Sequence, residues 1–360
     1  MTLTIEREVP LAPFTTLGIG GPATFFATAA TVDDFREALD WARTRGHQIF
    51  LLGGGSNLLI ADRGFDGLVV RIGLRGITVI DEDPGAVNVK GAAGEPWDEF
   101  VSFVVVRGWA GVECLSGIPG TTGATPIQNV GAYGQEVSET IVRVEALDRT
   151  TGRVVWLANW DCRFSYRSSL FKLHERDRYV ILSVTFHLKV GGAAAIRYPE
   201  LRQYIDDQGI DDHDLLAVRN AVIAIRKRKG MVLDPADPDT RSDGSFFTNP
   251  IIPIAQLPAF LERAKAVGGE SRIPHFPSGD EVKLSAAWLI EQAGFHKGFV
   301  HANVGLSSKH TLAVINRGGG TAAEVMELVE MIQRRVRDAF ALELTPEPRF
   351  VGPQPAGIGS

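Results

Sequence analysis

The most informative segment of the sequence is Leu52-Gly53-Gly54-Gly55-Ser56-Asn57-Leu58. It follows residues 49–52, a short apolar run that we expect to form a buried strand. Glycines after a strand let the backbone turn tightly, so that bare N–H groups can point at a phosphate. The alternative is a tight turn without a ligand. The stretch is not a Rossmann fingerprint, because Leu58 occupies the place of the third glycine.

A second glycine-rich turn, Gly318-Gly319-Gly320-Thr321-Ala322-Ala323, matches that fingerprint better. It lies between a predicted strand at 312–315 and a predicted helix at 321–340. The acidic residue that the fingerprint requires about 20 positions later would be Asp338, which falls inside this helix instead of at a strand end. Thr321 and Glu324 form a capping box. We therefore interpret this turn as a helix entry.

A third candidate is the long segment 108–134, which is rich in Gly, Pro and Thr and has little periodicity. Its many apolar residues predict an ordered binding loop. Together with the first turn, it suggests a cofactor with two ends to hold. The residues alone indicate a nucleotide cofactor and leave its class open.

The remaining elements alternate between helices and strands. We predict a helix capped by Thr31, and a hairpin of residues 144–147 and 153–157. We also predict a strand at 179–188 and helices at 97–106, 212–229, 254–267 and 283–293.

The composition is that of a globular protein, with 360 residues, 44% of them hydrophobic and 22% charged. A net charge of −6 gives no reason to expect nucleic-acid binding. Two cysteines exclude a disulfide framework. The N-terminus lacks a basic region followed by an apolar one, and no apolar run approaches the ~20 residues that span a bilayer. We expect a cytoplasmic protein without membrane contact.

Five motifs in order resemble the UDP-N-acetylenolpyruvoylglucosamine reductase family, over about residues 11–352. Two are the Gly53 turn and the segment from Ile118 to Gly134. The other three are Phe164-Ser165-Tyr166-Arg167-Ser168-Ser169-Leu170-Phe171-Lys172, Gly244-Ser245-Phe246-Phe247-Thr248-Asn249-Pro250 and Pro346-Glu347-Pro348-Arg349-Phe350.

The resemblance implies an α+β fold. A two-part FAD-binding region of the vanillyl-alcohol-oxidase-like (PCMH-type) class would precede a C-terminal α/β substrate-binding domain. The implied domains are residues 1–75, with 342–360 packing back on them, then 76–210, then 211–341.

The implied reaction has two halves. NADPH reduces non-covalently bound FAD and leaves, and UDP-N-acetylglucosamine enolpyruvate enters the same cleft to become UDP-N-acetylmuramate, a peptidoglycan precursor. A shared cleft needs no separate Rossmann site for NADPH.

Three residues are implied as catalytic. Arg167 would face the negative charge that builds beside the substrate carboxylate, because a guanidinium binds a carboxylate bidentately and keeps its proton. Ser245 would give a proton to carbon. Glu347, held between two prolines, would assist Arg167 in protonated form. Its competitor is Glu343, but the Pro-Glu-Pro-Arg-Phe register selects Glu347.

The resemblance also implies the binding residues. Those for FAD are Gly53, Gly54, Gly55, Ser56, Asn57, Leu58, Pro119, Gly120, Thr121, Gly123, Gln128, Asn129 and Gly131. Those for the UDP-sugar are Tyr133, Tyr166, Lys229, Asn249 and Tyr198, the last in the substrate-covering loop of one subclass. Two departures, Thr15-Thr16 for Asn-Thr and Thr248 for a basic residue, bear on contacts to FAD or diphosphate.

Two rivals remain open. One is an FAD oxidase of the same cofactor fold acting on an alcohol or sugar, although the Gly53 turn has no His or Cys for a covalent flavin. The other is a non-catalytic flavin- or nucleotide-binding module. The histidines, including His296 and His301, lack metal-ligand spacing, so we expect no metal site. We expect a monomer.

Overall fold

The computed structural model describes residues 3–268 and 273–353, and the chain divides into two compact units. Unit 1 is built from three segments that end at Val9, Gly55 and Val232. Unit 2 is built from three that begin at Pro10, Ser56 and Leu233. The division into three domains at residues 75 and 210 remains a prediction. In the described part of the chain, no helix is both long and apolar enough to cross a membrane.

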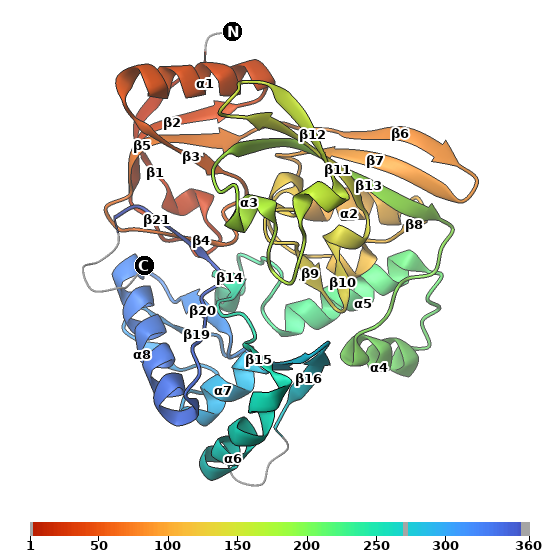
Figure 1. Cartoon of the computed structure of the whole chain (residues 1–360), viewed down its shortest axis with the longest axis vertical. Helices are drawn as coiled ribbons and strands as arrows, with labels where there is room; N and C mark the ends of the chain where they lie inside the picture. The colour runs from red at the N-terminus through yellow and green to blue at the C-terminus, as the bar shows by residue number, and fades with distance from the viewer. Residues whose placement is uncertain (1–2, 269–272, 354–360) are drawn as a thin grey trace. The chain divides into compact units, whose positions relative to one another are not determined.

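The first sheet of unit 1 has the strand order β1-β2-β5-β3, and helix α1 covers one face of it (Figure 1). Phe35, Ala38 and Ala42 of α1 pack against apolar side chains of β2 and β5. Thr31 caps the helix as predicted, with its side chain accepting the Asp34 N–H. The bounds are β1 (Glu6–Pro10), β2 (Pro22–Ala29), α1 (Val32–Arg45), β3 (Gln48–Leu52) and β5 (Phe65–Ile72).

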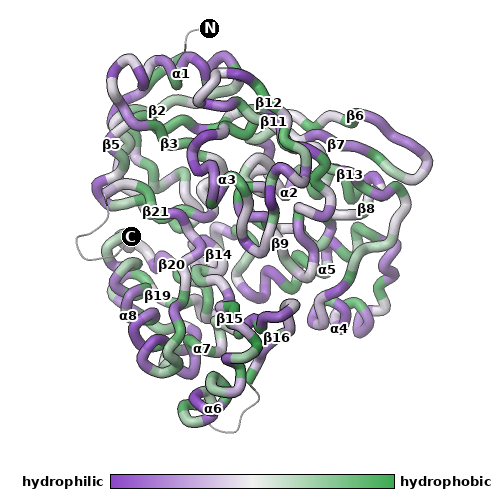
Figure 2. Tube along the Cα trace, viewed as in Figure 1, coloured by the Kyte–Doolittle hydropathy of each residue, from purple (hydrophilic) through white to green (hydrophobic). Residues whose placement is uncertain are grey.

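The second sheet of unit 1 has the order β12-β11-β13-β7-β6, with β8 also paired to β13. The predicted hairpin is confirmed as β11 and β12, which pair antiparallel. Hydrophobic residues concentrate along β11 and β13 in Figure 2, in keeping with their central place in the sheet. The bounds are β6 (Ile77–Asp83), β7 (Ala86–Ala92), β8 (Trp109–Ala110), β11 (Ile141–Asp148), β12 (Val154–Ala158) and β13 (Tyr179–Val190).

The segment 108–134 is ordered, as predicted, and is tied to helices on this sheet. Asp98 accepts hydrogen bonds from both Nη atoms of Arg219, at 2.6 and 2.7 Å, and from the Gly117 N–H at 2.5 Å. Burial raises the pKa of Asp98, but these bonds outweigh it and the pKa is lowered. The other elements of unit 1 are α2 (Trp97–Val105), β9 (Gly131–Ala132), β10 (Gln135–Glu136), α3 (Leu170–Leu173), α4 (Pro199–Gln208) and α5 (Leu215–Arg228).

Unit 2 combines a four-stranded sheet, β14-β20-β19-β18, with a three-stranded sheet, β15-β17-β16, and three helices. The strand pairs within both sheets are antiparallel. A separate parallel pair joins β21 to β4. The bounds are β4 (Leu58–Ile60), β14 (Ser242–Ser245), β15 (Ile251–Pro253), α6 (Leu257–Gly268), β16 (His275–Ser278), β17 (Glu281–Leu284), α7 (Ala286–Gln292), β18 (Val300–His301), β19 (Val304–Leu306), β20 (Ala313–Asn316), α8 (Ala322–Phe340) and β21 (Arg349–Val351).

Three helices begin later than predicted. Helix α5 starts at Leu215 instead of residue 212, because Asp214 caps it by accepting the Ala217 N–H. Helix α7 starts at Ala286 instead of residue 283, because Lys283 pairs with Ile251 in a sheet. A 3-10 turn precedes α6, which starts at Leu257 instead of residue 254. The predicted starts were three residues too early, because a cap, a strand partner or a 3-10 turn decides each boundary.

The Gly318 turn is the entry to α8, as interpreted from the sequence. The helix is amphipathic, as its alternating colours in Figure 2 show, and Thr321 and Glu324 form the predicted capping box. A carboxylate already occupies its N-terminus: Asp62 accepts the Ala322 N–H at 2.7 Å and the Ala323 N–H at 3.0 Å. An anion from the protein itself therefore satisfies the N–H groups that a dinucleotide would need.

We predict that Asp62→Ala lowers the free energy of unfolding by about 1 kcal/mol, because it removes an anionic acceptor from the positive end of α8. The measurement is urea unfolding followed by circular dichroism. Asp66→Ala is the matched control, because Asp66 is also exposed and caps no helix. Equal losses in the two variants would contradict this role for Asp62.

Candidate functional site

The Gly53 turn and the Gly120 turn of unit 1 lie in backbone contact. A Cβ added at Gly54 would lie 2.6 Å from Gly120 Cα and 3.3 Å from Thr121 N. One at Gly53 would lie 3.1 Å from Thr121 Oγ1. Gly120 also has a φ of 111°, which side chains rarely adopt. Glycine is therefore required on both sides of this contact.

The Gly120 turn is held by Trp97, at the start of helix α2, and by the turn that precedes this helix. The Trp97 N–H donates to Gly120 O at 3.1 Å, and the Thr122 and Gly123 N–H groups donate to Glu95 O and Ala93 O. The buried Thr121 Oγ1 has no hydrogen-bond partner in residues 3–268 and 273–353. Because a buried hydroxyl normally finds a partner, this atom indicates a polar ligand at the turn.

Asn129 is a buried residue of the same segment whose side-chain amide has three hydrogen-bond partners, and its φ is 46°. Its Nδ2 donates to Glu136 Oε2 at 2.7 Å and to Ser165 O at 3.1 Å, and its Oδ1 accepts the Ser138 N–H. Every polar atom of the amide thus has a protein partner. The side chain of Asn129 therefore fixes the conformation of the loop.

Arg167 is held rigidly beside Asn129. Its Nη2 donates to Gly131 O at 2.7 Å, and its guanidinium lies 5.5 Å from the centre of the Tyr166 ring. Its φ of 53° is strained for an arginine, and Lys172 Nζ donates to its carbonyl oxygen at 2.9 Å. The guanidinium is therefore a positioned cation, and a guanidinium is a group that binds carboxylates in a bidentate manner.

Tyr133, Tyr198 and Lys229, which are far apart in the sequence, lie together in unit 1. The two tyrosine rings meet edge to face, with centroids 5.5 Å apart, and Lys229 Nζ lies 5.8 Å from the Tyr133 ring centre. Lys229 also forms an ion pair with Glu200. Burial raises the pKa of Tyr133 to about 12, so its hydroxyl is neutral at physiological pH.

Ser245 and Glu347 lie on adjacent segments of unit 2. The Glu347 N–H donates to Phe246 O at 2.8 Å, and Phe247 forms a bridge with Pro346. Asn57, from the predicted cofactor turn, donates through Nδ2 to Glu347 O at 3.2 Å. The segments that carry the predicted acid, glutamate and cofactor turn are thus tied together by their backbones.

Asn249 also belongs to unit 2, where its Oδ1 accepts the Ala286 N–H at 2.9 Å. That bond satisfies the first N–H of helix α7. The amide therefore has a structural contact in addition to the predicted contact with a sugar nucleotide.

The structure groups the predicted residues into two sets, one per unit. Arg167 belongs to unit 1, and Ser245 and Glu347 belong to unit 2. Sequence reasoning did not identify Glu136, which holds Asn129, or Glu200, which pairs with Lys229. Glu136 lies just outside the recognised segment that ends at Gly134 and contacts a residue 7 positions away. Glu200 lies beside Tyr198 in the predicted substrate-covering loop, but its partner Lys229 is 29 positions away.

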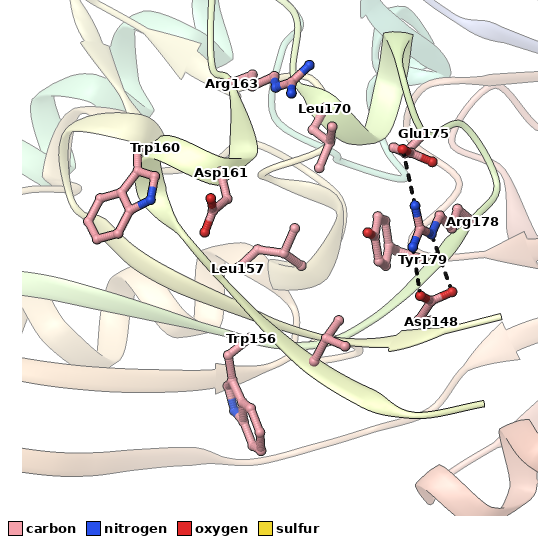
Figure 3. Close-up of a pocket in the computed structure, with 11 residues that line it drawn as sticks. Asp148, Trp156, Leu157, Trp160, Asp161, Arg163, Leu170, Glu175, Arg178 and Tyr179 are labelled. Atoms are coloured by element: carbon pink, nitrogen blue, oxygen red, sulfur yellow. Dashed lines mark hydrogen bonds and ion pairs between the residues drawn. The ribbon is translucent and has the colours of Figure 1, made fainter. Parts of the chain in front are cut away.

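A separate pocket of about 520 Å³ lies in unit 1 and includes none of the predicted site residues (Figure 3). Trp156 and Trp160 line it and are exposed. Arg178 pairs with Asp148 at 2.9 Å and with Glu175 at 3.2 Å. The Arg178 bonds lower the pKa of Asp148 to about 2. Arg178 is thus already paired with two carboxylates, whereas the printed contacts of Arg167 are with carbonyl oxygens and an aromatic ring.

Comparison with known proteins gives two matching family models. The FAD binding domain model matches residues 23–158. The model of the UDP-N-acetylenolpyruvoylglucosamine reductase C-terminal domain matches residues 234–351. The first range contains the two touching glycine turns and Asn129, and the second contains Ser245 and Glu347.

Full-length relatives agree with these models. A UDP-N-acetylenolpyruvoylglucosamine reductase of Thermobifida fusca is 47% identical over 355 residues, which cover 98% of this chain and 99% of that protein. A UDP-N-acetylenolpyruvoylglucosamine reductase of Saccharopolyspora erythraea is 48% identical over 348 residues, which cover 95% of this chain and 94% of that protein. The crystal structure of the Thermus caldophilus reductase has a TM-score of 0.65 at 24% identity and covers 97% of this chain and 100% of that one.

We predict that Gly54→Ala lowers the free energy of unfolding of the ligand-free protein by about 1–3 kcal/mol, because the new methyl group would overlap Gly120 backbone. Thermal and urea unfolding measure this loss. Gly85→Ala is the control, since a Cβ there meets no atom within 4 Å, and it should change stability by less than about 0.5 kcal/mol. A harmless Gly54→Ala would show that the two turns need no close contact.

Proposed function

The chain belongs to the UDP-N-acetylenolpyruvoylglucosamine reductase family, and we propose that Arg167, Ser245 and Glu347 carry out its chemistry. It is an FAD-dependent oxidoreductase that uses NADPH to reduce UDP-N-acetylglucosamine enolpyruvate to UDP-N-acetylmuramate, in peptidoglycan precursor synthesis. The observation that carries this conclusion is 47% identity across nearly the whole of both chains. The oxidase and the non-catalytic module do not account for that match.

FAD, when bound, supplies hydride transfer from NADPH to the substrate. The residues present fit this cofactor: the Gly53–Gly55 and Gly120 backbones leave no side chain in the way, and Thr121 Oγ1 is a buried atom without a protein partner in the described ranges. We propose that Gly53 to Leu58 and Pro119 to Gly123 bind the pyrophosphate. Gln128, Asn129 and Gly131 lie nearby in this proposal, with Asn129 fixing the loop.

Arg167 is proposed to bind the substrate carboxylate. A guanidinium that is already held by Gly131 O and the Tyr166 ring loses little side-chain freedom on binding. Hydride arriving at the vinyl carbon builds negative charge next to the carboxylate, and a fixed cation stabilises that charge. This is a reason to hold Arg167 in a strained backbone conformation.

Ser245 is proposed to give its hydroxyl proton to the other carbon of the double bond. One hydride and one proton then complete the reduction, and solvent returns the proton to the serine. Glu347 is proposed to assist Arg167 at the substrate carboxylate. The bonds from Glu347 N–H to Phe246 O and from Asn57 Nδ2 to Glu347 O support a fixed position of Glu347 relative to the segment that carries Ser245.

The sugar nucleotide is proposed to contact Tyr133, Tyr166, Tyr198, Lys229 and Asn249. In the ligand-free protein Glu200 neutralises Lys229, so a diphosphate would replace one anion by another at the same ammonium group. Tyr133 is neutral and can donate its hydroxyl proton to an anionic ligand. We further propose that NADPH uses the same cleft, and that the protein acts as a cytoplasmic monomer with the three domains that the resemblance implies.

The function is tested with the purified protein under anaerobic conditions. We expect a non-covalent flavin spectrum, bleaching by NADPH, and reoxidation by the enolpyruvyl sugar nucleotide. Failure of that substrate to reoxidise the flavin overturns the function. Fast reoxidation by oxygen alone would favour the oxidase.

We predict that Ser245→Ala leaves flavin reduction by NADPH within about twofold and slows substrate-driven reoxidation by about 10²-fold or more, because only the second half needs its proton. Stopped-flow absorbance separates the two halves. Ser242→Ala is the control from the same strand. Equal loss in both halves would remove Ser245 from the acid role.

We predict that Glu347→Gln slows the second half-reaction by about 10²-fold, because it weakens stabilisation of the charge that develops at the carboxylate. Glu343→Gln is the matched control and should stay within about twofold, since Glu343 is an exposed partner of Arg337. The reverse ranking would transfer the role to Glu343.

A further inference from the structure

Asp243 is a buried carboxyl group that the proposed mechanism does not use. It lies on β14, two residues before Ser245, and is only 7% exposed. Thr16 Oγ1 donates to Oδ1 at 3.1 Å, and the Leu58 backbone N–H also binds this carboxyl group. The buried Oδ2 has no hydrogen-bond partner within the described ranges.

The surroundings of Asp243 favour its neutral form. Burial raises the pKa to about 8, although the bonds from Thr16 and Leu58 act in the opposite direction. The groups that hold it carry no charge, and no charged side chain of the described chain is among the causes of the shift. Near neutral pH the carboxyl group of Asp243 is therefore mostly protonated. Its Oδ2 atom can then carry the proton and donate a hydrogen bond.

The neighbours of Asp243 indicate which group would accept a hydrogen bond from its protonated Oδ2 atom. Leu58 is the last residue of the turn proposed to hold the FAD pyrophosphate, and it binds Asp243 directly. Thr16 directly follows Thr15, the residue that replaces the Asn of the family's Asn-Thr pair at a position expected to bear on FAD or diphosphate contacts. A diphosphate oxygen accepts hydrogen bonds strongly and repels a carboxylate, so it discriminates between the two forms of Asp243.

We propose that the acid form of Asp243 donates a hydrogen bond to a diphosphate oxygen of bound FAD, and that loss of this proton weakens FAD binding. The inference rests on the proposed FAD site and adds to it a residue that no motif of the sequence singled out.

The proposal fixes the direction of a pH effect. If FAD binds only the acid form, its apparent Kd is constant below about pH 7 and rises as Asp243 ionises, by about tenfold between pH 7 and pH 9. In the ligand-free protein, the ionisation of Asp243 should affect the free energy of unfolding over a different pH range. Unfolded Asp243 loses its proton near its ordinary pKa of 3.8 and folded Asp243 near 8, so this group's contribution to stability falls between those values and is level above them.

The test is FAD binding to the ligand-free protein from pH 6.5 to 9.5, measured by quenching of flavin fluorescence. Asp243→Asn keeps an N–H donor at the same place and cannot ionise, so it should bind FAD with a Kd that barely changes between pH 7 and 9. Asp239→Asn is the matched control: Asp239 is equally buried in the preceding segment, but its Oδ2 accepts from Ser308. It should keep the pH dependence of the wild type.

A second measurement tests the proposal if Asp243→Asn folds poorly. The wild-type protein alone should take up a proton when it binds FAD at pH 8.5, detectable by titration calorimetry in buffers of different ionisation enthalpy. Equal pH slopes in the wild type and Asp243→Asn, or no proton uptake, would overturn the role of Asp243. Absence of FAD binding at pH 7 in the wild type would instead overturn the proposed cofactor site.

Discussion

The close approach of two backbones, at Gly54 and Gly120, is the constraint on which the candidate cofactor site depends. No side chain fits between them, and the Gly120 turn is itself held by hydrogen bonds that involve Ala93, Glu95 and Trp97. The site is thus built from main-chain atoms of a strand end and a loop. Backbone atoms move little once a core is packed, which suits a site proposed to hold the diphosphate of a resident cofactor in one position.

The candidate catalytic groups are positioned by the same means. Arg167 donates a hydrogen bond to the carbonyl oxygen of Gly131. The backbone N–H of Glu347 donates to Phe246 O, and its carbonyl oxygen accepts from Asn57 Nδ2. Their side chains start from fixed backbones, so the entropy cost of orienting them falls on folding and not on each reaction cycle. Asp243 fits this pattern, because it joins the turn at Leu58 to the strand of Ser245.

Much of the fold and of the candidate site could be predicted from the sequence. The features that could not be predicted depend on contacts between residues far apart in the chain. The caps at Thr31 and Thr321 were predictable because the residues involved are three apart. The Gly318 turn was correctly assigned as a helix entry because the acidic residue that the fingerprint requires, Asp338, would fall inside the helix and because Thr321 and Glu324 form a capping box. The pairing of Asp62 with α8, 260 positions away, and the burial of Asp243 depend on tertiary packing, which periodicity does not encode. The roles of Arg167, Ser245 and Glu347 came from resemblance and remain predictions.

The parallel pairing of β21 with β4 affects how the protein folds while it is being synthesised on the ribosome. Residue 57 and its partner at 347 are separated by 290 positions, so at 5–20 residues per second the turn waits about 15–60 s for the strand that secures it. During this interval β4 has an unpaired edge, and unpaired edges are where nascent chains aggregate. Unit 2 combines residues 10–22 and 56–65 with residues 233–360, so its packing can be completed only after unit 1 has been synthesised.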